Sequence, residues 1–173
     1  DVFSRITNWK KRDCVFFGDG AGAAVISPTK SGGFINFRIC SDGKSKFVFT
    51  VPAGGSELPA SPATVRKGLH YFQMDGKQVY DIATKVIPDV IRQLLKESHI
   101  KLEDIDWLVP HQPGVRILKK TMEDLGLPAN KVAMNMEKYA NTAGATIPIL
   151  LDELSREQKL HKGDMILFAA AGS

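Results

Sequence analysis

From residue 76 onward, apolar residues alternate between helical and strand-like spacing, and this alternation restricts the possible folds more than any other feature. A long helix is predicted where apolar residues recur every three or four positions, at Val79, Ile82, Ala83, Val86, Val90, Ile91, Leu94 and Leu95. Pro88 lies inside this helix, where it removes one hydrogen bond and is expected to cause a kink. The apolar run over 105–109 then predicts a strand.

The same alternation continues to the end of the chain. A second helix is marked by Ile117, Leu118, Met122 and Leu125, and ends at Gly126 and Pro128. Another apolar run covers 132–136, a third helix is expected over about 143–158, and Gly163 precedes a strand over 165–170. Strands separated by helices predict an α/β fold in which a parallel or mixed sheet is covered by helices.

The first 75 residues have a less regular pattern. Residues 14–17 and 23–26 predict one buried strand with a glycine-rich interruption, ended by Pro28. Residues 28–75 are rich in Gly, Pro, Ser and Lys. Within them we expect a strand over 33–40 and a possible second strand over 47–51.

Charge and cysteine content exclude several classes of protein. The 173 residues carry 23 Lys and Arg against 19 Asp and Glu, a net charge of +4, and these charges are mostly interleaved. The only dense basic run is 10–12, without interleaved aromatic residues, so nucleic-acid binding is not predicted. No apolar run approaches the ~18 residues that span a bilayer, and no leader is recognisable. Two cysteines without zinc spacing favour a reducing, cytoplasmic setting and no metal site.

The two ends of the sequence suggest a segment of a longer protein. Residue 1 is Asp rather than Met, and a predicted buried strand leads directly into a glycine turn at Gly172. We therefore expect the chain to lack part of its fold.

The glycine-rich loop Gly18-Asp19-Gly20-Ala21-Gly22-Ala23 matches a dinucleotide-binding pattern only superficially. That pattern requires a helix immediately after the loop, with its amino terminus facing the pyrophosphate. Here the following residues, Ala24-Val25-Ile26-Ser27-Pro28, continue as a strand. Close backbone packing or a turn explains these glycines better.

Two polar loops follow the ends of predicted strands, and in parallel sheets the catalytic and binding residues usually lie in such loops. His111 follows the strand that ends at Val109. A histidine in such a loop is more often a satisfied polar residue than a catalyst, but this position makes acid, base or donor chemistry a candidate role. Asn141 lies before the third helix, where it either caps that helix or points its amide into a cleft. The sequence alone leaves both alternatives open for Asn141.

Three basic residues and two cysteines complete the candidate list. Arg116, Lys119 and Lys120 share one helix face, which is either solvated or suited to a phosphate or an acidic helix. Cys14 is expected to be buried in a strand and unreactive, and neither it nor Cys40 is predicted to be a nucleophile. The sequence contains no Gly-x-Ser-x-Gly motif, so a serine hydrolase is not supported.

Taken as an ordered set, four stretches resemble the C-terminal half of a β-ketoacyl-acyl-carrier-protein synthase III of the thiolase superfamily. They are Phe17-Gly18-Asp19-Gly20-Ala21-Gly22-Ala23, Met74-Asp75-Gly76-Lys77-Gln78-Val79, Val109-Pro110-His111-Gln112 through Arg116-Ile117, and Asn141-Thr142-Ala143-Gly144-Ala145-Thr146-Ile147-Pro148. The resemblance implies half of a five-layered αβαβα thiolase-like fold. Residues 1–27 would end the N-terminal half, and 28–173 would form the C-terminal half without its final strand.

The resemblance also implies a reaction. In this family, a cysteine upstream of this segment is acylated from acyl-CoA and then condenses with malonyl-acyl-carrier protein, which loses carbon dioxide. The catalytic His and Asn fall on His111 and Asn141, where two N–H donors would stabilise the enolate. No cofactor is implied beyond these substrates.

Further roles follow from the same resemblance. The carrier-protein-binding stretch falls on Gln112, Pro113, Gly114, Val115 and Arg116, beside the basic face of Lys119 and Lys120. A CoA contact falls on Arg12 (or Lys11), and the oxyanion-hole turn begins at Gly172 and Ser173. The whole enzyme would be a homodimer, and this chain alone would be inactive.

Departures from the family leave an alternative open. The family often has Ala-Asn where this chain has Pro113-Gly114, and Gly where it has Ala140. A specialised thiolase-fold acyltransferase, or a non-catalytic partner subunit, would also fit these residues.

Overall fold

The computed structural model describes residues 1–45 and 47–172. Two parallel strands, β3 (Trp107–Pro110) and β4 (Ile166–Ala169), form its centre, with Leu108 opposite Leu167 and Val109 opposite Phe168. Leu108 and Val109 are consecutive and both buried, as in a strand that is covered on both faces.

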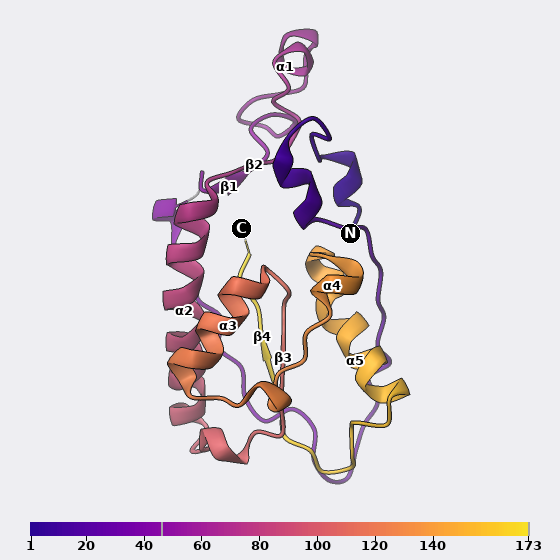
Figure 1. Cartoon of the computed structure of the whole chain (residues 1–173), viewed down its shortest axis with the longest axis vertical. Helices are drawn as coiled ribbons and strands as arrows, with labels where there is room; N and C mark the ends of the chain where they lie inside the picture. Colours follow the sequence, from indigo (N-terminus) through magenta and orange to yellow (C-terminus); the bar gives the residue numbers. More distant parts are fainter. Residues whose placement is uncertain (46, 173) are drawn as a thin grey trace.

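Helices cover both faces of this strand pair (Figure 1). α2 (Gly76–Glu97) and α3 (Val115–Leu125) pack on the face that presents Leu108 and Leu167, and α5 (Thr146–Arg156) packs on the face that presents Val109. The predicted α/β architecture, strands covered by helices, is confirmed.

The amphipathic pattern explains why the long helix forms and what it buries. Ala83, Ile87, Ile91 and Leu95 are spaced by four residues and all lie in the core. Asp75 caps the first turn by accepting a hydrogen bond from Gln78 N. Pro88 is buried inside a helix that continues from 76 to 97.

The other predicted elements of this region also form. α3 ends at Gly126, whose φ of +70° is the left-handed cap that favours glycine. The helix predicted over 143–158 appears as a 3-10 turn at Ala143–Ala145 followed by α5. The run over 132–136 is shorter than predicted, because Val132 makes only an isolated parallel bridge to Leu108 before α4 (Met136–Tyr139) begins.

The remaining elements are short. They are the strands β1 (Phe49–Thr50) and β2 (Gln73–Met74), the helix α1 (Pro62–Arg66), and 3-10 turns at Phe3–Arg5, Arg12–Phe16, Gly43–Ser45, Leu102–Asp104 and Ala129–Lys131. β1 pairs antiparallel with β2 and lies within the possible strand at 47–51. Four aromatic rings, Phe3, Phe17, Phe49 and Phe72, stack or meet edge-on and hold the N-terminal segment against β1.

Two predicted strands are wrong. Residues 12–16 form a 3-10 turn, and the described residues 20–42 contain neither helix nor strand, so the strands expected over 14–26 and 33–40 do not form. A strand is stable only when its backbone pairs with a neighbour. Gly20 exchanges two backbone hydrogen bonds with Asp1, but residues 21–42 have no backbone partner in the described part of the chain, and Val25 and Ile26 are 98% and 94% exposed. The domain boundary predicted at residue 27 falls inside this segment and stays a prediction.

Candidate active site

His111 directly follows β3 and is fixed at both its backbone and its ring. Its backbone N donates to Ala169 O at the end of β4 (2.7 Å), and its ring Nδ1 lies 2.8 Å from the hydroxyl oxygen of Thr146. Burial lowers the pKa of the imidazole below its usual value, and a hydrogen bond to the backbone of Ala143 offsets this only in part. Burial therefore favours the neutral form of the ring.

Gln112 braces the loop that carries His111. Its side chain is fully buried, and its Nε2 donates to Pro110 O (3.1 Å) and Ala133 O (3.3 Å). Its Oε1 accepts from Asn135 N at 3.2 Å. All three bonds are internal, so the prediction that Gln112 offers a contact to a carrier protein needs correction: this side chain supports the loop from within.

Asn141 is buried, and its amide has a defined orientation. Its Oδ1 accepts a hydrogen bond from Ala143 N at 2.8 Å, which is the capping turn that the sequence allowed. With Oδ1 turned to the backbone, Nδ2 has no hydrogen-bond partner among the described residues. Capping and donation are therefore compatible at Asn141.

The glycine-rich loop presses against the segment that holds Asn141. Phe16 O accepts from Asn141 N (2.9 Å), and Gly18 N donates to Asn141 O (3.0 Å). A Cβ atom on Gly18 would lie 2.5 Å from Tyr139 O, one on Gly20 2.9 Å from Thr142 Cβ, and one on Gly22 2.5 Å from the Pro148 ring. These glycines allow close packing, as the sequence predicted.

The backbone beside Asn141 is strained. Ala140 has φ +57° and ψ −156°, a region that essentially only glycine occupies without cost. Replacing Ala140 with glycine is expected to raise the free energy of unfolding by about 1 kcal/mol, measured by denaturant titration. Ala145, buried at φ −81°, is the matched control, and glycine there is expected to destabilise the chain. Equal losses at the two positions would contradict the strain.

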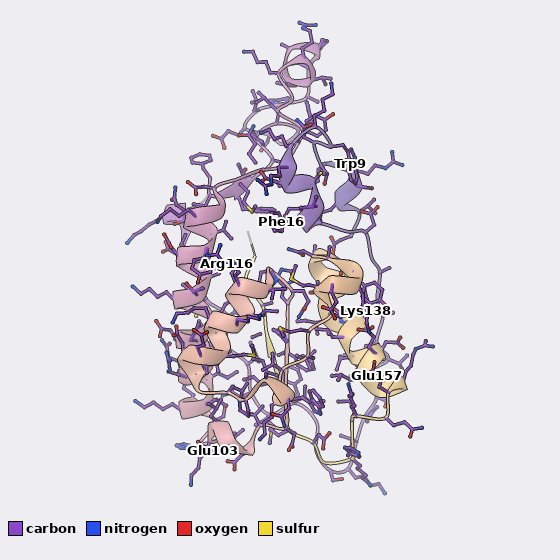
Figure 2. All side chains as sticks on the ribbon, viewed as in Figure 1. Trp9, Phe16, Glu103, Arg116, Lys138 and Glu157 are labelled. Carbon is purple, nitrogen blue, oxygen red and sulfur yellow. The ribbon has the colours of Figure 1, made fainter. Side chains whose placement is uncertain are left out.

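His111 and Asn141 meet through Ala143. The N–H of Ala143 donates to Asn141 Oδ1, and its C=O lies 2.9 Å from the Thr146 hydroxyl, which in turn contacts His111. Both side chains line one large open hollow, which extends from the N-terminal segment along the strands to residues 163–165 before β4. Figure 2 shows Phe16, Arg116 and Lys138 around the carboxyl ends of β3 and β4, with Glu103 and Glu157 at the opposite end.

The predicted carrier-binding and basic residues lie beside this hollow. Pro113, Gly114, Val115 and Arg116 line it. The Arg116 guanidinium stacks over the Tyr80 ring of α2, 5.3 Å from its centroid. Lys119 is exposed, whereas Lys120 pairs with Asp124 at 2.8 Å and Glu123 at 3.7 Å, so part of its charge is already neutralised.

The remaining candidates lie near the N-terminal segment and the end of β4. A hollow of about 320 Å³ there is lined by Lys11 and Cys14; Arg12 is exposed and lies outside the described lining. Cys14 is partly exposed in a 3-10 turn, so its predicted burial in a strand is wrong, and Cys40 is exposed. Gly172 is exposed beyond β4, and Ser173 lies outside the described residues.

Sequence reasoning missed Thr146. This residue is 35 positions from His111, and its sole local signal is a hydroxyl at a helix start, which reads as an ordinary cap. The contact arises only when α5 packs against β3.

The described residues contain neither a metal-ligand cluster nor a helix that could span a membrane. Among residues 1–45 and 47–172, no three His, Cys, Asp or Glu side chains gather as metal ligands. Over the same residues, each helix is too short or too polar to cross a bilayer.

Solved structures share the fold of this chain. The 3-oxoacyl-[acyl-carrier-protein] synthase III of Aquifex aeolicus VF5 superimposes with a TM-score of 0.85 at 32% identity, over 99% of this chain and 51% of that chain. The corresponding Pseudomonas aeruginosa PAO1 protein gives 0.82 at 30% identity, over 98% and 51%. The fold is therefore thiolase-like.

The sequence comparisons specify the family. Residues 95–173 match the family model 3-Oxoacyl-[acyl-carrier-protein (ACP)] synthase III C terminal, and residues 1–43 match 3-Oxoacyl-[acyl-carrier-protein (ACP)] synthase III. The chain belongs to the β-ketoacyl-acyl-carrier-protein synthase III family.

Curated relatives match along the whole chain. The Beta-ketoacyl-[acyl-carrier-protein] synthase III of Caldanaerobacter subterraneus subsp. tengcongensis is 42% identical over 175 residues, and that of Symbiobacterium thermophilum is 39% identical over 175 residues. In both cases the match covers 100% of this chain and 53% of the relative. The chain thus spans about half the length of these relatives.

Proposed function

We propose that this chain is the decarboxylating, carrier-facing half of an acyltransferase that joins an acyl-CoA primer to malonyl-acyl-carrier protein and so initiates fatty-acid synthesis. The observation that carries the proposal is the link between His111 and Asn141 through Thr146 and Ala143, with Asn141 Nδ2 left without a partner among the described residues. Two neutral N–H donors at one place suit the oxygen of a thioester rather than a carboxylate or a phosphate.

The chemistry follows from those donors. When the malonyl thioester loses carbon dioxide, the electrons of the broken C–C bond pass into the thioester carbonyl and give an enolate. His111 and Asn141 stabilise its oxygen, and each such donor contributes about 3 kcal/mol in the transition state. The enolate carbon then attacks the acyl-cysteine carbonyl, and the cysteine thiolate leaves. We propose that this cysteine comes from the half of the relatives that the chain does not match.

The surface around His111 and Asn141 carries the residues that would contact the proposed partners. Arg116, held over Tyr80, and the exposed Lys119 would face an acidic carrier protein, with residues 113–115 lining the entrance for its thioester arm. Lys11 and Arg12 would contact acyl-CoA, and Gly172 with Ser173 would begin the oxyanion-hole turn. We propose a cytoplasmic homodimer whose reaction uses these two substrates and no further cofactor.

The exposed apolar residues of the segment 20–42 suggest that this chain packs against the half of its relatives that it does not match. Val25, Ile26, Phe34 and Ile39 are all more than 80% exposed on the open hollow. Several large apolar side chains left exposed in one segment are typical of an interface. We therefore propose that the relatives' other half covers this segment, and that the chain alone is inactive.

The test joins this chain to the half of the Caldanaerobacter relative that it does not match; we call the product the fused enzyme. The fused enzyme is expected to condense malonyl-carrier protein with acyl-CoA primers from two carbons upward, while the chain alone gives no product. Product with short primers supports initiation of fatty-acid synthesis. A folded fused enzyme that yields no product with any primer would overturn the proposal in favour of a non-catalytic subunit.

A further inference from the structure

α4 is a single helical turn whose place in the fold is not set by apolar packing. It spans Met136–Tyr139, none of its residues is buried, and one turn of helix has little stability of its own. Asn141 follows this turn directly, after the strained Ala140. The contacts that hold α4 in place therefore also decide where the amide of Asn141 points.

The carboxylate of Glu153 on α5 holds α4 at two points. Its Oε2 accepts a hydrogen bond from Asn135 Nδ2 at 2.6 Å, and its Oε1 accepts one from Lys138 Nζ at 2.9 Å. Asn135 immediately precedes α4, and its backbone oxygen accepts hydrogen bonds from Lys138 N and Tyr139 N. Lys138 lies where α4 meets α5 (Figure 2). One side chain thus binds both the start and the interior of the turn.

Glu153 itself has a fixed position and a charge. Leu150 and Leu154, on the same helix, are buried in the core cluster that contains Val109 of β3, so α5 is anchored to the sheet. Burial alone would raise the pKa of the Glu153 carboxyl, but hydrogen bonds from Asn135 and from residues of α4 outweigh it and hold this pKa below its ordinary value. The carboxylate is therefore charged at neutral pH, and its hydrogen bonds are charge-assisted.

Asn135 connects this carboxylate to the loop that carries His111. Asn135 is 3% exposed, and its backbone N donates to Gln112 Oε1 at 3.2 Å. Glu153 Oε2 is the acceptor that the described residues provide for Asn135 Nδ2, and a buried donor without an acceptor is costly. Loss of the carboxylate would therefore displace Asn135, and with it α4.

We propose that Glu153 is a positioning residue that holds Asn135 and α4 against α5 and thereby fixes the direction of the Asn141 amide. The catalytic consequence rests on the proposed function, whereas the position of the amide is a property of the folded chain. Glu153 is not among the described residues that line the hollow around Asn141. It acts only through its contacts with Asn135 and Lys138.

NMR of the chain labelled with ¹⁵N-asparagine reports the side-chain amides of Asn135 and Asn141 directly. Glu153→Leu removes both acceptor oxygens, and is expected to shift the Asn135 resonances because their acceptor is lost and the Asn141 resonances because α4 moves. Glu157 is the matched control, since it is exposed at the end of α5 and pairs with Lys159. Glu157→Leu is expected to leave both amides unchanged.

An exchange of donor and acceptor separates this hydrogen bond from the general effect of a substitution. Asn135→Asp sets two carboxylates against each other, and in the fused enzyme it is expected to slow malonyl decarboxylation by up to about 100-fold, the loss that a misplacement of about 1 Å can cause. Glu153→Gln is expected to lose less, because its amide oxygen still accepts from Asn135. The double variant Asn135→Asp with Glu153→Gln again places a donor opposite an acceptor, and is expected to recover most of the rate.

Two results would overturn the proposal: Asn141 resonances that stay in place in Glu153→Leu, or a double variant that is no faster than Asn135→Asp. Should Asn135→Asp not fold, the amide resonances of Glu153→Leu and Glu157→Leu still decide whether the carboxylate positions Asn141. An inactive unmodified fused enzyme contradicts the proposed function and leaves the NMR result standing.

Discussion

Replacing Asn141 with alanine in the fused enzyme is expected to lower the rate of malonyl decarboxylation by two to three orders of magnitude, the usual loss when one oxyanion donor is removed. The substitution deletes the free Nδ2 donor and also the Oδ1 acceptor that fixes Ala143. Acylation of the cysteine by acyl-CoA is expected to continue, because that step precedes decarboxylation. The measurements are release of carbon dioxide from malonyl-carrier protein and mass spectrometry of the acylated protein.

Two comparisons make this result specific. His111→Ala is expected to cause a loss of similar size, and the double variant to lose less than the product of the single losses, because the donors act on one oxygen. Asn130, exposed in the 3-10 turn at Ala129–Lys131, is the matched asparagine, and Asn130→Ala is expected to leave both steps unchanged. Decarboxylation retained in both Asn141→Ala and His111→Ala would refute the assigned roles.

The extent to which the sequence predicts this fold depends on whether each element has its partner nearby. α2, α3 and α5 follow from local periodicity, because a helix forms its backbone hydrogen bonds internally and needs only one apolar face covered. β3 and β4 were also predicted, and each has the other as its neighbour. Residues 20–42 have strand-like apolar runs but no pairing strand in the described part of the chain, and the pattern carries no information about that missing contact.

The sequence likewise predicts some residues of the candidate site and not the environment of others. His111 and Asn141 could be singled out because both follow predicted strand ends, and the structure joins them through Ala143. Gln112 was assigned to the carrier-binding surface from the family resemblance alone. Its burial depends on acceptors at Pro110 and Ala133 and a donor at Asn135, which the fold alone brings together.

Gly18→Ala is expected to be the most damaging substitution outside the two donors. The new Cβ would lie 2.5 Å from the backbone oxygen of Tyr139, so the backbone must move, since no flexible side chain can give way. We expect a loss of about 2 kcal/mol in the free energy of unfolding, within the range of overpacking in a tight core. Denaturant unfolding of the chain measures this loss.

The matched control for that substitution is Gly43→Ala. A Cβ on Gly43 meets nothing within 4 Å, so its stability is expected to stay within about 0.5 kcal/mol of the original chain. The two variants therefore separate the clash from the general effect of replacing glycine. Equal stability of Gly18→Ala and Gly43→Ala would mean that the glycine loop and the Asn141 segment do not touch.

The clash in Gly18→Ala should also affect malonyl decarboxylation. Gly18 N donates to Asn141 O, and Phe16 O accepts from Asn141 N, so displacing the loop also displaces the Asn141 backbone. In the fused enzyme, Gly18→Ala should therefore slow decarboxylation even below the temperature at which it unfolds, whereas Gly43→Ala should not. A glycine that supplies neither donor would then be required, because Gly18 and Phe16 bond to the Asn141 backbone and so fix the direction of its free amide.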